Sequence, residues 1–168
     1  KRSGIFCQIN GCRQRPMGGE EAMSRKAARE HAFKIVYELP FYQGLEQENV
    51  TVLTDFYMRD FVEESLDEAD TAFIQAETLG VQQKQKELDE AIGAALKGWK
   101  VSRLSRVDLA ILRLAAYEIL YMPSLPVKVS INEAVELAKR YSQEAAPAFI
   151  NGILGTIALK RTDEDEEL

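Results

Sequence analysis

Residues 127–154 read V-K-V-S-I-N-E-A-V-E-L-A-K-R-Y-S-Q-E-A-A-P-A-F-I-N-G-I-L, and this stretch carries the signals of two consecutive helices. Ser130 and Glu133 stand in the S-x-x-E spacing of a capping box, in which two side chains satisfy free backbone N–H groups at a helix start. The spacing predicts a helix that begins near Ser130 and keeps one apolar face. That inward face consists of Ile131, Ala134, Val135, Ala138 and Tyr141.

The second helix of this stretch begins near Pro147, because proline is tolerated in the first turn of a helix. Gly152 and Gly155 lie inside this helix, where each glycine costs roughly 1 kcal/mol relative to alanine. The two glycines therefore predict that another backbone, or a ligand, comes close to the helix. Its inward residues are expected to be Phe149, Ile150, Ile153, Leu154 and Ile157.

The rest of the chain also shows helical periodicity, and no segment has the alternation that a β-strand requires. Ser65 and Glu68 form another capping box, which opens a helix that is expected to end at Gly80. The helix expected over residues 105–121 is apolar on most sides, so it should be central and enclosed. The other helices are expected over residues 24–39, 50–64 and 82–97. The predicted fold class is therefore all-α, with about seven helices.

The composition is that of one globular domain, with 46% hydrophobic and 29% charged residues in a chain of 168. Residues 1–22 lack periodicity, which predicts a disordered leader before a helical domain over residues 23–160 and an acidic tail over residues 161–168. No apolar run approaches the ~20 residues of a membrane span. The basic N-terminus also lacks the apolar region of a secretory signal, so we expect a cytoplasmic protein.

Motifs for catalysis and metal binding are absent from the sequence. It contains no phosphate-binding loop, dinucleotide fingerprint, zinc-protease motif or nucleophile elbow. Cys7 and Cys12 lie together in the leader and His31 is the single histidine, so too few ligands exist for a zinc site. We therefore expect no enzyme activity, no cofactor and no metal, and the sequence favours a binding protein.

Basic residues are clustered although the net charge is −6, a value that argues against nonspecific coating of nucleic acid. Arg25, Lys26 and Arg29 occupy the first turns of the first helix, where the helix dipole disfavours cations. Contact with a phosphate backbone would offset that penalty. If this group converges in space with two further groups, the three make one positive face. The second group is Lys97, Lys100, Arg103 and Arg106, and the third is Lys128, Lys139 and Arg140.

Three blocks of sequence in order resemble the NusB family of bacterial transcription antitermination factors. They are S-R-K-A-A-R-E-H-A-F-K-I-V-Y-E-L (residues 24–39), R-L-S-R-V-D-L-A-I-L-R-L-A-A-Y-E-I-L (residues 103–120) and the segment containing I-N-E-A-V-E-L-A-K (residues 131–139). The resemblance covers residues 23–160 and implies a NusB-like fold of two packed helical subdomains. Ala145 and Gly155 depart from the common family pattern, which bears on the tuning of RNA binding rather than on the fold.

The resemblance implies binding of a short single-stranded RNA, the boxA signal in the leaders of ribosomal RNA transcripts. The family has an arginine-rich start to its first helix that contacts RNA, and further RNA-binding positions on its last two helices. Phe149 could stack on an unpaired base, although its spacing alone suggests a core residue. The candidate RNA-binding residues are Arg25, Lys26, Arg29, Lys128, Lys139, Phe149 and Asn151.

The resemblance also implies a surface for NusE, a protein of the small ribosomal subunit, and entry of the pair into the antitermination complex on RNA polymerase. Tyr37 and Asp108 match positions on that protein-binding side. Asp108 is an acid on an otherwise apolar helix, so it should reach solvent or a partner cation, or pair internally with Arg113. RNA and NusE should raise each other's affinity reciprocally.

Two alternatives stay open. The same helical module occurs at the N-terminus of ribosomal RNA cytosine methyltransferases, but the sequence shows no following Rossmann-like domain with a catalytic cysteine. The other alternative is a protein–protein adaptor without RNA contact, including a homodimer of the kind that some relatives form. A steep fall of RNA affinity with salt would separate an RNA-binding protein from such an adaptor.

Overall fold

The computed structural model describes residues 25–42, 47–62 and 67–166, which are helical almost throughout. Seven α-helices and two short 3₁₀ helices occupy these ranges, in which there is no β-strand. The all-α prediction is thereby confirmed, whereas the predicted leader over residues 1–22, with both cysteines, lies outside the described residues. The elements are α2 (Arg25–Glu38), η1 (Leu39–Phe41), α3 (Gln47–Phe61), α4 (Glu68–Gln83), α5 (Gln85–Ala95), η2 (Val101–Arg103), α6 (Arg106–Tyr121), α7 (Val127–Tyr141) and α8 (Ala146–Glu166).

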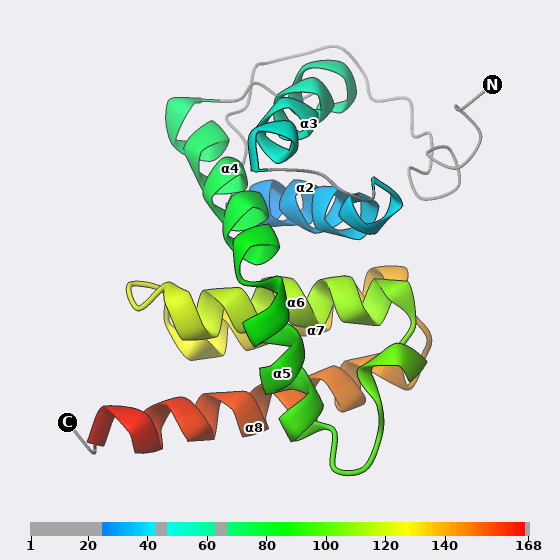
Figure 1. Cartoon of the computed structure of the whole chain (residues 1–168), viewed down its shortest axis with the longest axis vertical. Coiled ribbons are helices and arrows are strands. Elements are labelled where there is room, and N and C mark those ends of the chain that lie inside the picture. The colour runs from blue at the N-terminus through cyan, green and yellow to red at the C-terminus, as the bar shows by residue number, and fades with distance from the viewer. Residues whose placement is uncertain (1–24, 43–46, 63–66, 167–168) are drawn as a thin grey trace.

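The helices form two groups that meet at α6 (Figure 1). In the first group, α4 packs against α2 and α3, and in the second group α6, α7 and α8 pack on one another. α5 lies against α6 and α8, while α2 and α4 of the first group both contact α6. This arrangement confirms the expected pair of packed helical subdomains. None of the described helices combines the length and hydropathy that a membrane crossing requires.

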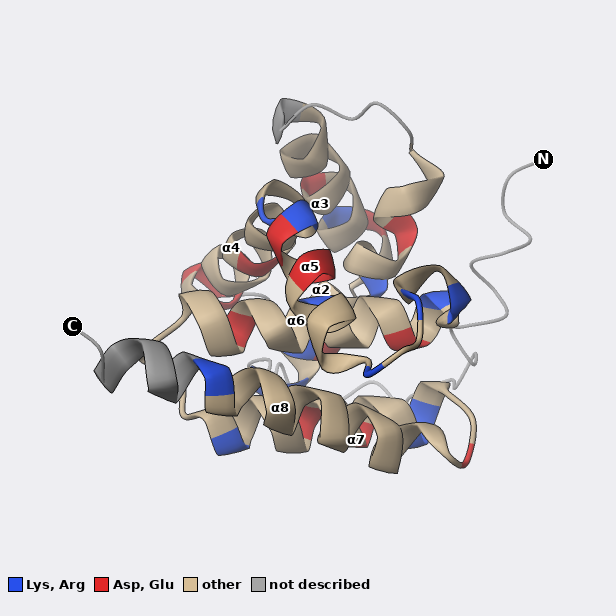
Figure 2. Cartoon of the chain, turned by 60° about the horizontal axis from the view of Figure 1, so that its bottom comes forward, with Lys and Arg blue, Asp and Glu red and all other residues tan. Residues whose placement is uncertain are grey.

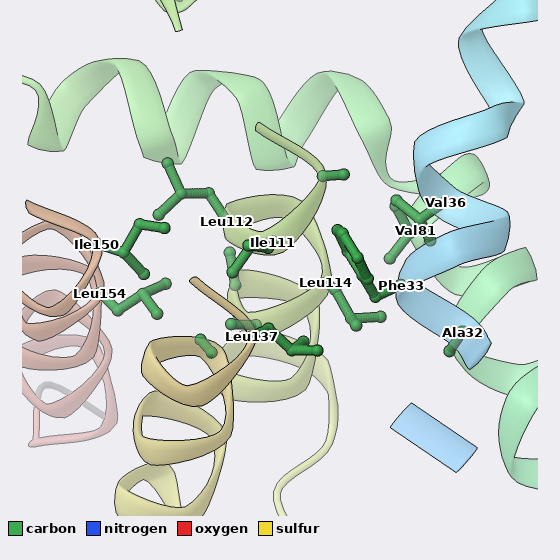
Figure 3. Packing of buried hydrophobic residues seen from close by; sticks show 14 of the residues in the cluster. Ala32, Phe33, Val36, Val81, Ile111, Leu112, Leu114, Leu137, Ile150 and Leu154 are labelled. Atoms are coloured by element: carbon green, nitrogen blue, oxygen red, sulfur yellow. The ribbon is translucent and has the colours of Figure 1, made fainter. Parts of the chain in front are cut away.

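One apolar core runs through both groups (Figure 3). Phe33 of α2 and Val81 of α4 lie on one side of α6, and Ile150 of α8 lies on its other side beside Leu112. Residues 110–116 of α6 are all buried, so the prediction of a central, enclosed helix is confirmed. Each large aliphatic side chain that is fully buried here contributes about 1.5–3 kcal/mol.

Two predicted helix starts are wrong. α7 begins at Val127 with Pro126 as its N-cap, because the extended Pro126 residue (φ −63°, ψ 129°) offers its carbonyl to the N–H groups of Val129 and Ser130. Ser130 is consequently inside α7, buried, and its hydroxyl has no hydrogen-bond partner among the described residues. α4 is capped by Asp67, whose side chain accepts from the Asp70 N–H at 2.7 Å, so Glu68 is not the third residue of a box opened by Ser65, which itself lies outside the described residues.

The prediction made for Gly80 is also wrong. Gly80 does not end α4, which continues to Gln83. It is instead the point where α4 meets α6, since a Cβ at Gly80 would lie 2.0 Å from Cζ of Tyr117. Gly152 and Gly155 were expected to lie close to another backbone or a ligand. No other part of the described chain comes within 4 Å of a Cβ added at either, so the close backbone is ruled out and the ligand stays a prediction. Close approach therefore occurs at the glycine that was interpreted as a helix stop.

Candidate nucleic-acid interface

Basic side chains from opposite ends of the sequence meet between α2 and α7. Lys26 and Arg29 of α2 line a pocket of about 210 Å³ together with Lys139 and Arg140 of α7. The first and third basic groups expected from the sequence therefore do converge in part. The pocket is completed by Glu30, Glu133, Glu136 and Leu137.

Carboxylates neutralise much of the positive charge in this pocket. Lys139 donates to Glu136 at 2.7 Å, and Arg140 pairs with Glu30. Glu30 also accepts from the Tyr141 hydroxyl at 2.5 Å. Burial alone would raise the Glu30 pKa, but the Tyr141 hydrogen bond and the charges of Lys34 and Arg140 outweigh it and lower that pKa. Lys26 is different, because its side chain is exposed and makes no described hydrogen bond or ion pair.

Arg29 is not the exposed cation that the sequence suggested. Its residue is only 4% exposed, and its Nε donates to Glu118 Oε1 at 2.5 Å. Its Nη1 lies 3.9 Å from Glu133 Oε2, and its guanidinium sits 5.6 Å from the centre of the Phe73 ring. Direct contact with a phosphate would require Arg29 to exchange the Glu118 carboxylate, which costs several kcal/mol for a buried ion pair.

Arg25 is exposed but turns toward α4. Its Nη1 donates to the carbonyl of Ala69 at 3.1 Å and lies 3.6 Å from Asp70 Oδ1, and its guanidinium lies 4.9 Å from the Phe73 ring centre. The acids at the start of α4 thus compensate for a cation at the start of α2. Arg25 is held at the junction of the two helices, beside the pocket and outside its lining.

Lys128 lies apart from the other candidates. It is in the first turn of α7, whereas Lys139 is in the last turn, about 16 Å away along the helix axis. Figure 2 shows basic segments at both ends of α7 and on several other helices, so the described Lys and Arg residues do not form one face. The predicted convergence of all three basic groups is therefore met only in part.

Phe149 and Asn151 stand near the start of α8, just after the short turn that follows α7. The Phe149 side chain is 38% exposed, and Asn151 is exposed as well. The inward placement predicted for Phe149 is therefore wrong, and its ring is accessible to a ligand. Because the turn is short, both residues lie at the same end of α7 as Lys139 and Arg140.

The two candidate partner residues, Tyr37 and Asp108, lie at one end of the molecule, and their side chains make different kinds of contact. Tyr37 is half-buried and its ring lies 5.9 Å from that of Phe41, which in turn stacks 4.7 Å from the Arg106 guanidinium. Asp108 accepts from the Ser105 hydroxyl at 2.7 Å and from the Ser142 hydroxyl at 2.6 Å. Asp108 therefore joins the start of α6 to the end of α7.

The alternative of an Asp108–Arg113 salt bridge is wrong. Arg113 forms a two-pronged pair with Asp89 of α5, at 2.8 and 2.7 Å. A serine N-cap, which the sequence patterns placed at two other helix starts, is instead found here, since the Asp108 N–H donates to Ser105 Oγ at 3.0 Å. Serine and aspartate at this spacing were a usable signal, because Asp replaces the usual Glu of the motif.

Sequence patterns assigned no role to Glu77, Glu118 or Trp99. Both glutamates are completely buried, and no described donor reaches either oxygen of Glu77. Burial first, and then the charge of Glu118, raise the Glu77 pKa well above its ordinary value. A glutamate in the apolar helix α6 was a visible signal for Glu118.

Trp99 is 63% exposed, and its setting between two lysines in K-G-W-K was a signal as well.

Comparisons with known proteins agree on one family. Residues 26–159 match the NusB family. The transcription antitermination protein NusB of Acetivibrio thermocellus is 44% identical over 135 residues, which cover 80% of this chain and 88% of that protein. T. maritima NusB has a similar structure, with a TM-score of 0.72, 30% identity, and coverage of 88% of this chain and 100% of the other.

A third likeness concerns the fold alone. The structure of antitermination factors NusB and NusE in complex with dsRNA aligns with a TM-score of 0.68 at 23% identity, and covers 81% of this chain and 96% of that one. Together with the matched range and the identity to the relative from Acetivibrio thermocellus, the fold leads to one conclusion. This chain belongs to the NusB family.

Proposed function

We propose that this protein is a transcription antitermination factor that binds boxA-type single-stranded RNA together with NusE. The observation that supports this most directly is the pocket where Lys26 of α2 meets Lys139 and Arg140 of α7. Its relatives are called transcription antitermination proteins, and family membership agrees with the expectation that the chain is not an enzyme. A protein of similar fold is found in complex with NusE and dsRNA.

Phosphates would enter the pocket by competing with its carboxylates. Lys26 can bind a phosphate oxygen without giving up a partner, whereas Lys139 must exchange Glu136 and Arg140 must exchange Glu30. Exposed ion pairs contribute only about 0–1 kcal/mol, so the exchange at Lys139 is inexpensive. The acids of the pocket would thereby disfavour weak, nonspecific RNA and admit strands that make several contacts at once.

Base recognition would fall to the neighbouring start of α8. The exposed Phe149 ring offers a surface on which an unpaired base can stack, and the Asn151 amide can hydrogen-bond to a base edge. Lys128, at the far end of α7, would bind a phosphate further along the strand. Arg25 and Arg29 would act mainly by fixing the start of α2 against α4 and α6, so that Lys26 is presented to solvent.

NusE would bind at the end of the molecule that carries Tyr37 and Asp108. The ring of Tyr37 and the exposed ring of Phe41 offer apolar contact area there, and Asp108 fixes the local backbone through Ser105 and Ser142. The protein would act in the cytoplasm by assembly, joining the antitermination complex on RNA polymerase. RNA and NusE would then increase each other's affinity by the same factor.

The test is RNA binding as a function of salt, with and without NusE. Lys26→Ala and Lys139→Ala should each weaken binding of a boxA-type RNA and lower the salt slope by about 0.7, the value for one phosphate contact on a single strand. Lys86→Ala, which removes an exposed lysine of α5 outside the pocket, is the matched control. Equal affinities for all three variants would contradict the proposed pocket.

One observation favours an adaptor that makes no RNA contact. Arg25, Arg29 and Arg140 are all engaged by carboxylates, so few of the basic side chains near the start of α2 are unpaired. In that case NusE would bind with the same affinity whether or not boxA-type RNA is present. Measurement of NusE affinity at saturating RNA distinguishes this function from the first.

A further inference from the structure

The connection between α5 and α6 holds an aromatic side chain out in solvent. Trp99 is 63% exposed, although Val101 and Leu104 on the same connection pack against the core. Leu96, which precedes Trp99, is buried as well, so the segment is anchored on both sides of an indole that is itself excluded from the interior. Large aromatic side chains normally contribute stability by burial, so an anchored and exposed Trp points to a ligand.

The backbone just before Trp99 is held in an unusual conformation. Lys97 has φ +37° and Gly98 has φ +95°, so two successive residues are left-handed, and the first of them carries a side chain. Left-handed conformations of residues other than glycine are strained and tend to persist at functional sites. The turn is closed by the Trp99 N–H, which donates to the carbonyl of Leu96 at 3.1 Å. Lys97 and Trp99 are both exposed in this turn, which follows the end of α5.

The charge of this connection is positive and unneutralised. Lys97, Lys100 and Arg103 are all exposed, and none of their side chains makes a hydrogen bond or ion pair with a described residue. The sequence contains no acidic residue from position 91 to position 107. The pocket between α2 and α7 differs, since three glutamates line it beside its cations. A polyanion would meet the α5–α6 connection without displacing any carboxylate.

This connection leads into the start of α6, which a hydrogen bond joins to the end of α7 that carries the pocket residues Lys139 and Arg140. The Ser142 hydroxyl, at the end of α7, donates to Asp108 at 2.6 Å and so fixes the start of α6 beside Lys139 and Arg140. Figure 2 shows the connection that leads into α6 at the same end of the molecule as the turn between α7 and α8. Arg106 follows the connection, and its guanidinium lies 4.7 Å from the centre of the Phe41 ring.

We propose that residues 97–103, here called the Trp99 loop, form a second contact for single-stranded RNA, in which Trp99 stacks on an unpaired base and Lys97, Lys100 and Arg103 hold the adjoining phosphates. This inference rests on the proposed function in one respect, because the same strand would run from the pocket to the loop. Aromatic side chains beside unpaired cations are the means by which proteins bind single strands with little sequence preference. An acidic protein segment is the other partner that such charges could attract.

Trp99 also reports directly on its own contact, because it is the only tryptophan of the chain. Addition of a single-stranded boxA-type RNA, or of an oligouridine of about twelve nucleotides, should quench the intrinsic fluorescence as a base stacks on the indole. The quenching should saturate at the same RNA concentration as binding measured by anisotropy of labelled RNA. A duplex of the same length should leave the fluorescence nearly unchanged, because its bases are already stacked.

Substitutions separate the ring from the charges. Trp99→Leu should weaken oligouridine binding about tenfold, whereas Trp99→Phe should retain most of the affinity because it keeps a stacking surface. Replacing Lys97, Lys100 and Arg103 together with alanine should lower the salt slope by about two. The exposed lysine Lys86, near the opposite end of α5, gives the matched control when changed to alanine. All these positions are exposed, so the melting temperature should hardly move.

The outcomes distinguish this inference from the proposed function. Binding of boxA-type RNA that is equally tight in Trp99→Leu, with no fluorescence change in the native protein, would overturn the Trp99 loop and leave the pocket in place. Failure of native protein to bind any single strand, with or without NusE, would overturn both. Quenching by NusE in the absence of RNA would assign Trp99 to a protein interface and overturn the inference.

Discussion

Lys26 and Arg29 are one helical turn apart on α2, and they have opposite roles. Arg29 lies under the pocket, 4% exposed and paired with Glu118 of α6. Lys26 lies at the pocket surface, where it is exposed and makes no hydrogen bond or close ion pair with a described residue, although its charge helps to lower the Glu136 pKa. Basic residues close together at a helix start can therefore differ in role, because one forms a buried ion pair that stabilises the fold while another stays exposed for binding. The residue that takes the structural role is the one whose side chain meets a buried carboxylate from another helix.

The substitution that should lower stability most is one that removes the buried partner of Arg29. Glu118→Ala leaves the Arg29 guanidinium buried, with Glu133 at 3.9 Å as its remaining carboxylate partner. Loss of one partner of a buried ion pair typically destabilises by about 3–5 kcal/mol, because a charge stays without compensation. Urea unfolding followed by circular dichroism should show this loss.

Two further variants sharpen that prediction. Arg29→Met combined with Glu118→Leu removes both charges and should recover most of the lost stability, since an apolar pair of similar volume can replace a buried ion pair. Glu118→Ala combined with Glu77→Gln should be less stable than Glu118→Ala alone, because Glu77 can otherwise lose its proton and pair with Arg29. Stability close to native in Glu118→Ala would show that Arg29 is not held as described.

The next effect concerns the α4–α6 contact that encloses the buried acids. Gly80→Ala places a Cβ 2.0 Å from the Tyr117 ring and should destabilise by about 1–3 kcal/mol, as overpacking does. Gly152→Ala is the matched control, since nothing lies within 4 Å of the added Cβ. There the better helix propensity of alanine should stabilise by up to about 1 kcal/mol. Thermal unfolding of the two variants should shift in opposite directions.

A third prediction concerns pH, through Glu77. Below its ordinary pKa of 4.5, both the folded and the unfolded protein carry the proton. Between 4.5 and the raised pKa of the folded state, the unfolded protein releases the proton while the folded one keeps it, so stability falls as pH rises. The fall is at most about 1.4 kcal/mol per pH unit and ends above the folded pKa.

Glu77→Gln removes this dependence, because glutamine stays neutral and its amide can donate to Glu118 as the protonated acid does. The melting temperature of Glu77→Gln relative to the native protein should therefore rise with pH between about pH 5 and the folded pKa. Glu90→Gln, which changes an exposed glutamate of α5, serves as the control and should track the native protein. A constant difference between Glu77→Gln and native protein across this range would show that Glu77 is ionised when folded.

The sequence predicts the helices well because periodicity is a local property. It places α5 and α6 within a few residues, and it indicates that α6 is enclosed. It does not distinguish Arg29 from Lys26, because the partner that buries Arg29 is Glu118, on a helix far along the chain. Ser130 failed as a cap for a related reason, since Pro126 starts α7 four residues earlier. Gly80 failed because its neighbour, Tyr117, is a tertiary contact.

The candidate site was predictable to the same extent, because its residues could be named from the sequence but their spatial neighbours could not. Lys139 and Phe149 could be named from the family resemblance, but the exposure of Phe149 and the closeness of Lys139 to Lys26 are visible only in the folded structure. The acids that line the pocket were present in the sequence as ordinary solvated charges. Their effect on Lys139 and Arg140 appears only when the helices are assembled.

The substitution that should change stability least is one that removes the exposed side chain of Lys26. Lys26→Ala removes a side chain that has no described partner, so the unfolding free energy should change by less than about 0.5 kcal/mol. Affinity for boxA-type RNA should nevertheless fall, and the fall should shrink as salt is raised, because the lost contact is to a phosphate. Lys26→Arg keeps the charge and should retain the affinity. If Lys26→Ala instead destabilised the fold as much as Glu118→Ala, both basic residues would have a structural role, and the pocket would have no cation that is free to bind a phosphate.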